Sequence, residues 1–384
     1  MADKEMLRKR EERIGKTIRC EKTDKVPFMI IADAYIPYYS QIKLKDVKTY
    51  DDAVVANKIM FDDLQNDCIM APYMPAQVML APKLKLLGGG AHVIGENMIK
   101  QINPESTQIM EADEYPALIK DPLNYVLETI YPRRYKLLAN DNAIEKFEKF
   151  TQVLQEAIKF GAYLQKCEEE TSSVVIANGM YYFNPIDLIF DLMRNFTGII
   201  KDVKRCPELL RDAGLAMVDG FSKMGTLVPP VAHKALACPM HLPPFISVKD
   251  FEKVYWPSFK MLTEAMVSQG HNVLYYFEKN YSHLYEFLQD LPKQRIIGVF
   301  EEDDLRFVKK KLGGTMSIAG GLKTNTMCYG TKEECINMTK GLIDDLGRDG
   351  GFFIAPDTPL VFPTDAKPEN LKAIAETIET YGVN

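Results

Sequence analysis

Short and nearly continuous apolar runs alternate with helical stretches along this chain, and this alternation limits the possible folds more than any other feature. Strands that are buried on both faces of a parallel sheet have this continuous hydrophobicity. The helices between them provide the crossovers that parallel strands require. We therefore expect an α/β fold, a (β/α)₈ TIM barrel with an N-terminal helical extension. The expected strands lie at 27–32, 68–71, 173–177, 225–229, 272–277, 295–300, 316–320 and 351–355.

Amphipathic helices are predicted between these strands, and two of them begin at recognisable N-cap residues, Ser247 and Thr331. The segment 72–141 has no clean strand, is rich in proline and contains three consecutive glycines, so we expect an insertion over one end of the barrel that could form a lid. No repeat or flexible linker is visible, which predicts a single domain over 1–384. The predicted helices cover 53–66, 142–166, 205–224, 247–270, 331–346 and 367–381.

Composition and charge exclude several classes of protein. The net charge is −6, which gives no electrostatic reason to expect a nucleic acid or an anionic membrane as partner. No window of about 18 apolar residues occurs and the N-terminus is charged, so neither a membrane span nor a secretory signal is predicted. The seven cysteines form no CxxC pair, which is typical of reduced thiols. We expect a cytoplasmic protein.

Polar and aromatic residues follow the predicted strands at the ends where TIM barrels place their active sites. Two histidines, several carboxylates and a group of aromatic side chains would meet there, as in a catalytic pocket for a ring-shaped substrate. The candidates are Asp33 after the first strand, Asn178, Met180, Tyr181 and Tyr182 after the third, His233 and His241 after the fourth, Tyr275, Tyr276, Phe277 and Glu278 at the fifth, and Asp357 after the eighth.

Each candidate also has a structural interpretation. A histidine near a strand end can simply be packed or act as a cap. Glu278 is harder to explain in this way, because a carboxylate directly after an apolar strand must be paired, metal-bound or solvated in a cavity. Cys238 and His241 lie three residues apart and could bind a soft metal, but such a spacing is common by chance.

Several reaction classes lack their sequence signatures. The chain has no P-loop, no GxGxxG after a strand, no GxSxG elbow and no HExxH. Nucleotide binding and the common hydrolase mechanisms are therefore not predicted.

The last 140 residues contain stretches that resemble the uroporphyrinogen decarboxylase-like superfamily, and in particular its corrinoid-dependent methyltransferase branch. Matching stretches are FISVKDFEKVYWPSFKML (245–262), NVLYYFEKNYSHLYEFLQDLPKQRIIGVFEEDD (272–304), LGGTMSIAGGL (312–322), YGTKEECINMTKGLID (329–344) and GGFFIAPDTPLVFPTDAKPENLKAIAETIETYG (350–382). The N-terminal third is similar only more loosely, through KVPFMI and NPIDLIFDLMRNFTGIIKDVKRCPELL (184–210).

Departures from the family patterns separate its branches. True uroporphyrinogen decarboxylases carry an arginine-rich stretch after the first strand to hold the carboxylates of the tetrapyrrole, and IIADAYIPYYSQ contains no arginine. Thiol-methylating members bind zinc through His-x-Cys after the fifth strand and a Cys after the eighth. In this chain the His-x-Cys position is occupied by Tyr275, Tyr276 and Phe277, and the position of the third ligand, the Cys after the eighth strand, by Asp357 and Thr358. The usual zinc ligands are therefore absent, although another metal arrangement stays open.

The subgroup that the chain resembles best has a Phe-Glu motif after the fifth strand, matched by Phe277 and Glu278, and a histidine after the fourth, matched by His233. This resemblance implies an O-demethylase that moves the methyl group of an aromatic methyl ether, such as veratrole, guaiacol or vanillate, to Co(I) of a corrinoid. The chain lacks the Asp-x-His-x-x-Gly signature for holding a corrinoid. The cofactor would therefore come on a separate corrinoid-binding protein.

In this hypothesis the aromatic side chains hold the ring, and His233 or His241, assisted by Glu278 or Asp357, donates a proton to the ether oxygen. The same groups could instead bind a divalent ion. Two alternatives stay open, a decarboxylase acting on another acid, with Lys234 or Lys323 as its cation, and a non-catalytic barrel that binds a corrinoid protein. Family relatives are often dimers, so a homodimer is possible.

Overall fold

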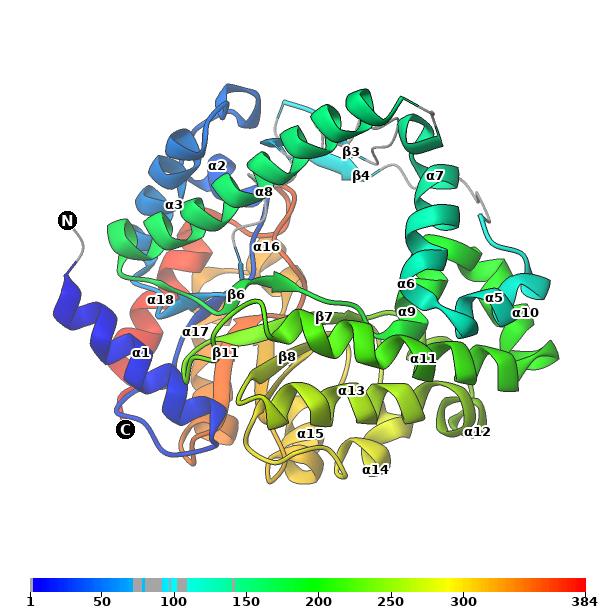
Figure 1. Ribbon diagram of the computed structural model, residues 1–384. Coiled ribbons are helices and arrows are strands. Elements are labelled where there is room, and N and C mark those ends of the chain that lie inside the picture. The colour runs from blue at the N-terminus through cyan, green and yellow to red at the C-terminus, as the bar shows by residue number, and fades with distance from the viewer. Residues whose placement is uncertain (1–2, 72–77, 80–91, 97, 102–108, 140–141) are drawn as a thin grey trace.

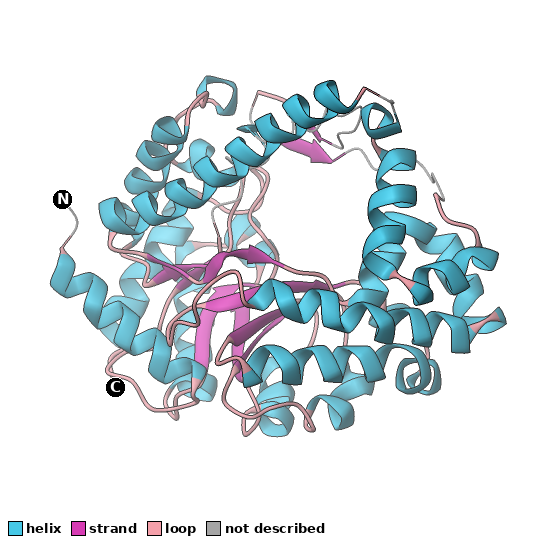
Figure 2. Cartoon of the chain, in the orientation of Figure 1, coloured by secondary structure: helices cyan, strands magenta, loops and turns pink. Residues whose placement is uncertain are grey.

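In the computed structural model of the chain the parallel strands lie together with helices beside and below them, and a short hairpin lies apart from them at the top of the view (Figures 1 and 2). The structure describes residues 3–71, 78–79, 92–96, 98–101, 109–139 and 142–384. Among these residues, no helix has both the length and the apolar character that crossing a membrane requires.

The parallel strands follow one another around a ring of eight positions. Their backbone hydrogen bonds form two sheets, one with the order β1-β2-β5 and one with the order β11-β10-β9-β8-β7-β6. The strands are β1 (Met29–Ile30), β2 (Cys68–Ile69), β5 (Val174–Val175), β6 (Ala177–Tyr181), β7 (Ala235–Met240), β8 (Asn272–Phe277), β9 (Ile296–Phe300), β10 (Ser317–Leu322) and β11 (Phe352–Pro356).

Hydrogen bonds join the two sheets at both junctions. Phe28 forms a parallel bridge with Ile354, whose backbone N–H donates to the carbonyl of Pro27 at 3.0 Å. At the other junction β5 continues into β6 through Ile176. The N–H of Ile176 donates to Ile69 in β2, and its carbonyl accepts from Ala235 in β7, both at 2.9 Å. The predicted eight-stranded TIM barrel is therefore confirmed.

Small and branched apolar side chains fill the barrel interior, and the N-terminal helix closes one end of it. Alternate residues of each strand point inward, and they form a buried cluster that also includes Ile14 and Ile18 of α1 (Lys4–Ile18). The predicted N-terminal helical extension is thus present, and it covers the end of the barrel opposite to the carboxyl ends of the strands.

The outer helices follow the strands in sequence and cover the outside of the barrel (Figure 1). The predicted N-caps are confirmed, because Ser247 accepts from the N–H of Asp250, and Thr331 forms a capping box with Glu334. The longer helices are α3 (Tyr50–Leu64), α8 (Ala143–Thr171), α10 (Asn195–Arg205), α11 (Pro207–Gly225), α13 (Trp256–Ser268), α15 (Leu305–Leu312), α17 (Lys332–Leu342) and α18 (Pro368–Tyr381).

One strand prediction was wrong, and the error changes the site. Residues 225–229 form the end of α11 and a turn, and the fourth strand of the barrel is β7 at Ala235–Met240. Two consecutive prolines, Pro229 and Pro230, remove backbone donors that a central strand needs. His233 therefore precedes the fourth strand, and only His241 follows it.

The predicted insertion at 72–141 lies partly outside the described residues. Its described part includes an antiparallel hairpin of β3 (His92–Ile94) and β4 (Ile99–Gln101), so the expectation of a segment without strands was wrong. Three short helices follow, α5 (Tyr115–Lys120), α6 (Pro122–Tyr125) and α7 (Tyr131–Arg134). Helix α5 is fixed to the barrel through Tyr115, which donates to Asp202 of α10 at 2.8 Å. A role as a lid stays a prediction.

A buried carboxylate, Asp67, holds the closed end of the barrel together. It is fully buried before β2, and one of its oxygens accepts from the N–H of Phe28 at 2.9 Å. The side chain also forms an ion pair with Arg13 and lies 3.5 Å from Lys25 and 3.9 Å from Arg10. This one carboxylate therefore connects α1 to the starts of β1 and β2.

We expect Asp67→Ala to destabilise the protein by about 3–5 kcal/mol, because it leaves Arg10 without its carboxylate partner and Arg13 and Lys25 with only the more exposed Asp24 and Glu379. Urea unfolding at pH 7 measures this change. Lys223→Ala is the control, since the Lys223–Asp219 pair is exposed and should contribute under about 1 kcal/mol. Equal effects of the two substitutions would contradict the role given to Asp67.

Candidate active site

Polar side chains meet at the open end of the barrel, where the strands end. His241 directly follows β7, Glu278 directly follows β8 and Asp357 directly follows β11. Asp33 comes three residues after the end of β1, and its N–H donates to the carbonyl of Leu360 at 2.8 Å. This is the end at which TIM barrels carry out chemistry.

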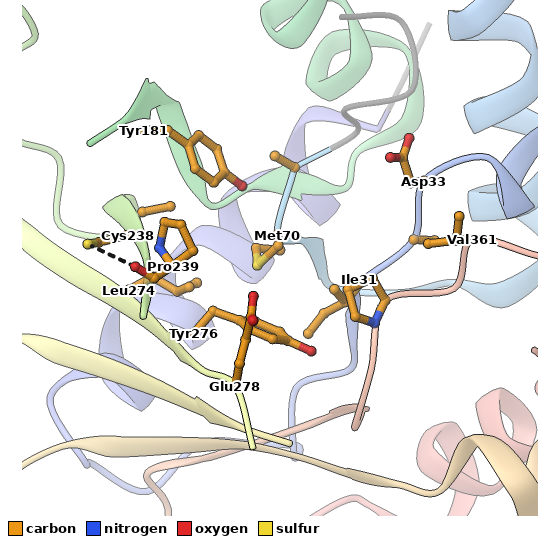
Figure 3. A pocket seen from close by; sticks show the side chains of 14 residues that line it. Ile31, Asp33, Met70, Tyr181, Cys238, Pro239, Leu274, Tyr276, Glu278 and Val361 are labelled. Atoms are coloured by element: carbon orange, nitrogen blue, oxygen red, sulfur yellow. Dashed lines mark hydrogen bonds between the residues drawn. The ribbon is translucent and has the colours of Figure 1, made fainter. Parts of the chain in front are cut away.

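A cavity of about 260 Å³ opens between these strand ends (Figure 3). Its walls are mostly apolar, and the two carboxyl groups on them belong to Asp33 and Glu278. The described residues that line the cavity are Ile31, Ala32, Asp33, Met70, Ala71, Tyr181, Ala237, Cys238, Pro239, Leu274, Tyr276, Glu278, Pro359 and Val361. Burial raises the pKa of the Cys238 thiol well above its ordinary value, so this cysteine is a neutral wall group.

Two of the predicted aromatic residues, Tyr181 and Tyr276, line this cavity. Tyr276 donates its hydroxyl hydrogen to the backbone carbonyl of Asp357 at 3.2 Å. Burial, together with the nearby carboxylates of Glu301, Glu278 and Asp357, raises the pKa of Tyr276 and keeps it a neutral phenol.

Three other predicted aromatic residues were placed wrongly, because their side chains point outward into the layer between strands and helices. Tyr275 and Phe277 flank Tyr276 in β8, so the pleat turns them to the opposite face. Tyr275 packs its ring edge against Phe259 of α13 and exchanges hydrogen bonds with Tyr182 (3.0 Å) and Thr263 (2.6 Å). Tyr182 is therefore also outside the cavity.

Asn178 and Met180 lie within β6 itself and not after it. Their side chains are outside what the structure describes, so their predicted contact with a substrate stays a prediction.

His241 stands between two carboxylates. Its Nδ1 lies 2.7 Å from Asp191 and its Nε2 lies 3.3 Å from Glu278. Burial by itself would lower the pKa of His241, but the hydrogen bonds to Asp191 and Glu278 outweigh it and raise this pKa to about 11. The imidazole therefore carries a proton at neutral pH, and Glu278 connects it to the cavity wall.

Two aspartates that sequence analysis missed hold His241 in place. Asp187 belongs to α9 (Pro185–Ile189), and Asp191 lies one turn later in η6 (Phe190–Arg194). Asp187 is fully buried, accepts from the N–H of Leu242 at 2.9 Å and accepts from the hydroxyl of Tyr255 at 2.5 Å. Burial raises the pKa of Asp187 to about 7. The sequence did contain a signal for these residues, because Asp187 and Asp191 are two carboxylates four residues apart in an otherwise apolar helical segment that follows a strand.

Asp357 has a mainly structural position. Its carboxylate accepts from the hydroxyl and N–H of Thr324 at 2.7 and 3.2 Å, at the start of α16 (Thr324–Tyr329), and lies 3.4 Å from the amine of Lys323. The backbone carbonyl of Asp357, which accepts from Tyr276, connects this residue with the cavity. The predicted carboxylate partner of the site histidine is therefore Glu278 and not Asp357.

His233 lies at the closed end of the barrel. It precedes β7, and its Nε2 is 3.5 Å from the carboxylate of Glu11 in α1. Burial lowers the pKa of His233. The prediction that His233 joins the other site residues was wrong, since it rested on the misplaced fourth strand.

The side chains of the site do not form a ligand set for a metal. Within the described parts of the chain, no group of three or more His, Cys, Asp and Glu side chains is arranged to hold a metal ion. The family's zinc-thiolate pattern does not fit this site, because Tyr275 is buried outside the cavity and both nitrogens of His241 face carboxylates.

The chain is similar to known proteins in both sequence and structure. The uroporphyrinogen decarboxylase (URO-D) family profile matches residues 189–381, which is half of the chain. No curated protein sequence matches the chain significantly. A methyltransferase from Methanosarcina mazei has a similar structure, with a TM-score of 0.64 and 13% sequence identity, over 97% of this chain and 98% of that one. At this identity the likeness supports the barrel fold.

We expect Asp191→Asn to lower the pKa of His241, because the neutral amide removes the negative charge beside Nδ1. NMR titration of the labelled imidazole measures this pKa, and Asp219→Asn on the exposed surface of α11 is the control. Since folding raises the pKa from 6.5 to about 11, the stabilisation is full below pH 6.5 and is lost as the pH rises toward about 11. An unchanged pKa in Asp191→Asn would refute the role of Asp191.

Proposed function

Because the chain belongs to the uroporphyrinogen decarboxylase family, we propose that it is one of the family's methyltransferases and not a decarboxylase. Its reaction is O-demethylation, in which the methyl group of an aromatic methyl ether moves to the Co(I) corrinoid of a separate corrinoid-binding protein. The observation that carries this proposal is the cavity with tyrosines in its wall and the protonated His241 behind Glu278.

The composition of the cavity argues against the tetrapyrrole reaction. A substrate with many carboxylates needs cations around it. None of the described residues that line the cavity is an arginine, lysine or histidine. The cavity is also small, near the lower limit of about 300 Å³ for ligand pockets, which suits a molecule with one ring.

The walls can hold a methoxy-substituted ring by apolar contact. Tyr181 and Tyr276 offer aromatic surface, and Met70 and Leu274 add flexible and branched apolar groups. Figure 3 shows these side chains around a common space, with the carboxylate of Glu278 reaching into it. The ether oxygen would lie toward Glu278 and the methyl group toward the open end of the barrel.

The leaving group explains why the site needs an acid. A reduced corrinoid presented by its carrier would supply the electron pair that forms the new bond to the methyl carbon, and the electrons of the methyl–oxygen bond would then remain on the phenolic oxygen. A phenol has a pKa of about 10, so its anion leaves poorly at neutral pH. The proton of His241, passed through Glu278, converts this oxygen to a phenol hydroxyl. Asp191 and Asp187 keep the imidazole oriented during this transfer.

The corrinoid must come from another protein under this proposal, since the chain lacks the Asp-x-His-x-x-Gly signature. We expect the carrier to approach the open end of the barrel, because α1 closes the other end. The single domain, the cytoplasmic location and a homodimer stay predictions.

Incubation of the protein with a reduced corrinoid protein and guaiacol tests the proposal, with the absorbance of methylated corrinoid as readout. We expect Glu278→Gln and His241→Gln to lower the rate by about 10²–10⁴-fold. The loss should shrink for a nitro-substituted methyl ether, whose phenolate leaves without help. His233→Gln is the matched control and should retain the rate, because His233 lies at the closed end.

Absence of methylated corrinoid over a broad panel of aryl ethers would contradict methyl transfer. Equal losses for both leaving groups would contradict proton donation while leaving the transfer itself intact. Full activity of both site variants would favour a barrel that binds a corrinoid protein without using this site.

A pair of neighbouring tyrosines tests the geometry of the cavity. We expect Tyr276→Leu to weaken guaiacol binding about tenfold or more, because a wall of the cavity is lost. Tyr275→Phe should leave the affinity unchanged and lower stability by about 1–3 kcal/mol, since it removes the hydroxyl that bonds both Tyr182 and Thr263 and leaves the buried hydroxyl of Tyr182 without this partner. Calorimetric titration and urea unfolding measure the two effects. Weaker guaiacol binding in Tyr275→Phe, with unchanged binding in Tyr276→Leu, would show that Tyr275 and not Tyr276 faces the cavity.

A further inference from the structure

We propose that Tyr281 is a positioning residue of this site, whose hydroxyl holds the side chains of His241 and Glu278 at the distance that proton transfer between them requires. The catalytic consequence rests on the proposed function. The positioning itself follows from the contacts of the loop between β8 and η9 (Ser282–Leu284).

His241 and Glu278 come from neighbouring strands and meet just beyond the end of their hydrogen-bonded ladder. The last paired residues of β7 and β8 are Met240 and Phe277, and the two site residues directly follow them. Backbone pairing therefore brings the two side chains close together without fixing the distance between them. The Nε2 of His241 lies 3.3 Å from Glu278, near the upper limit for a hydrogen bond, so an increase of about 0.3 Å would break it.

Tyr281 provides a contact between the two strand ends. It lies on the same loop as Glu278, and its hydroxyl donates to the backbone carbonyl of Met240 at 2.8 Å. Its ring is buried and packs edge-to-face with Phe277, with the ring centroids 4.9 Å apart. One side chain thus connects the loop that carries Glu278 to the residue directly before His241.

Carboxylates after β9 hold the backbone of the same loop. Lys279 has a positive φ of 65°, which a non-glycine residue retains only where other contacts hold it, and its N–H donates to Glu301 at 2.6 Å. The N–H of Tyr281 donates to both oxygens of Asp303, at 3.0 and 3.2 Å. Asp303 is buried, and the N-cap of α15 is the next residue, Asp304, so Asp303 holds the loop and does not cap the helix.

The backbone on the other side of His241 is fixed as well. The N–H of Leu242 donates to Asp187 at 2.9 Å, and Asp187 also accepts from the hydroxyl of Tyr255. The hydroxyl of Tyr281 and the carboxylate of Asp187 therefore hold the two peptide groups that flank His241. Of these two contacts, the one from Tyr281 comes from the loop that carries Glu278, so it is the contact that couples the two site residues.

The proposed proton transfer depends on this coupling. The proton passes from Nε2 of His241 to a carboxylate oxygen of Glu278, and from Glu278 to the oxygen of the leaving group. Each transfer requires the donor and the acceptor within hydrogen-bond reach. Tyr281 is not among the described residues that line the cavity, so its hydroxyl should affect proton transfer and not the binding of the ring.

Exchange of the Nε2 hydrogen of His241 with water tests the positioning without any corrinoid protein. The histidines are labelled with nitrogen-15, and the spectrum of His241→Gln identifies the signal among the five histidines of the chain. At pH 7 we expect Tyr281→Phe to exchange this hydrogen about tenfold or more faster, because a hydrogen bond to Glu278 that opens more often protects it less.

Tyr285→Phe is the matched control. Tyr285 is also a buried tyrosine after β8, and its hydroxyl bonds to the same carboxylate, Asp303, but the bond between Tyr281 and Met240 remains in this variant. We expect it to leave the exchange rate unchanged. Thermal unfolding shows whether each variant is folded. Asp303→Asn weakens the hold on the N–H of Tyr281 and keeps the hydroxyl, so it should give a smaller increase, and it tests the inference if Tyr281→Phe does not fold.

The rate of methyl transfer gives a second readout. We expect Tyr281→Phe to lower kcat for guaiacol about tenfold and to leave KM unchanged, because proton transfer is impaired while the cavity is intact. The loss should shrink for a nitro-substituted methyl ether, whose phenolate leaves without a proton.

The outcomes separate this inference from the proposed function. Unchanged exchange in Tyr281→Phe overturns the positioning role, whether or not methyl transfer occurs. An equal increase in Tyr285→Phe also overturns it, because the region around Asp303 would then be loosened in general. Faster exchange in Tyr281→Phe alone, with an unchanged rate for guaiacol, supports the positioning and contradicts proton donation through Glu278.

Discussion

The pleat of the barrel strands is the constraint on which this site depends. Successive side chains of a strand point to opposite faces, and in a closed barrel one face is the interior and the other is the helix layer. Tyr276 therefore enters the cavity, while Tyr275 packs against Phe259 of α13 and Phe277 stacks on Phe300 of β9. The aromatic end of β8 thus provides one side chain that lines the cavity, Tyr276, and two that pack in the hydrophobic core, Tyr275 and Phe277. Glu278, one step beyond the strand, reaches the cavity from the rim.

The chemistry depends on a second constraint, the position of one histidine. A histidine whose two nitrogens face carboxylates keeps its proton at neutral pH, and under the proposed function this proton goes to the leaving oxygen. The backbone next to His241 is fixed by Asp187 through Leu242, and the ring is fixed by Asp191. Both aspartates come from one helical segment after β6, the third strand of the barrel. This segment therefore fixes the orientation of His241, which follows the fourth strand, β7.

Sequence analysis predicted the barrel well, because a buried parallel strand has a strong signal. The runs at 272–277, 295–300, 316–320 and 351–355 coincide with β8 to β11 within one or two residues. The fourth strand was missed because β7 contains two alanines, a cysteine and a proline, whereas the preceding turn has leucine and valine. That one shift put His233 beside His241 in the predicted site, whereas His233 precedes β7 and only His241 follows it. Once β8 was identified, the alternation of side chains along a strand could have shown that Tyr275 and Tyr276 point to opposite faces.

Other parts of the site lay beyond the sequence for physical reasons. The pairing of His241 with Asp191 joins residues fifty positions apart, and no local pattern specifies such a contact. Asp187 resembles an ordinary helix residue in the sequence, and only its complete burial and its two donors show that it holds the site. The capping role of Asp357 likewise depends on where α16 begins relative to β11.

The two ends of the barrel divide the charges between stability and chemistry. At the closed end, Arg10, Arg13 and Lys25 surround one buried carboxylate, Asp67, and fix α1 in place. At the open end, carboxylates line or surround the cavity, and His241 lies between two of them. A barrel that must bind a polycarboxylate needs the opposite arrangement at its open end, because each substrate charge has to be balanced by a cation near the cavity. Under the proposed function the apolar cavity therefore suits an aromatic ring, while the guanidinium groups of Arg10 and Arg13 serve stability at the closed end.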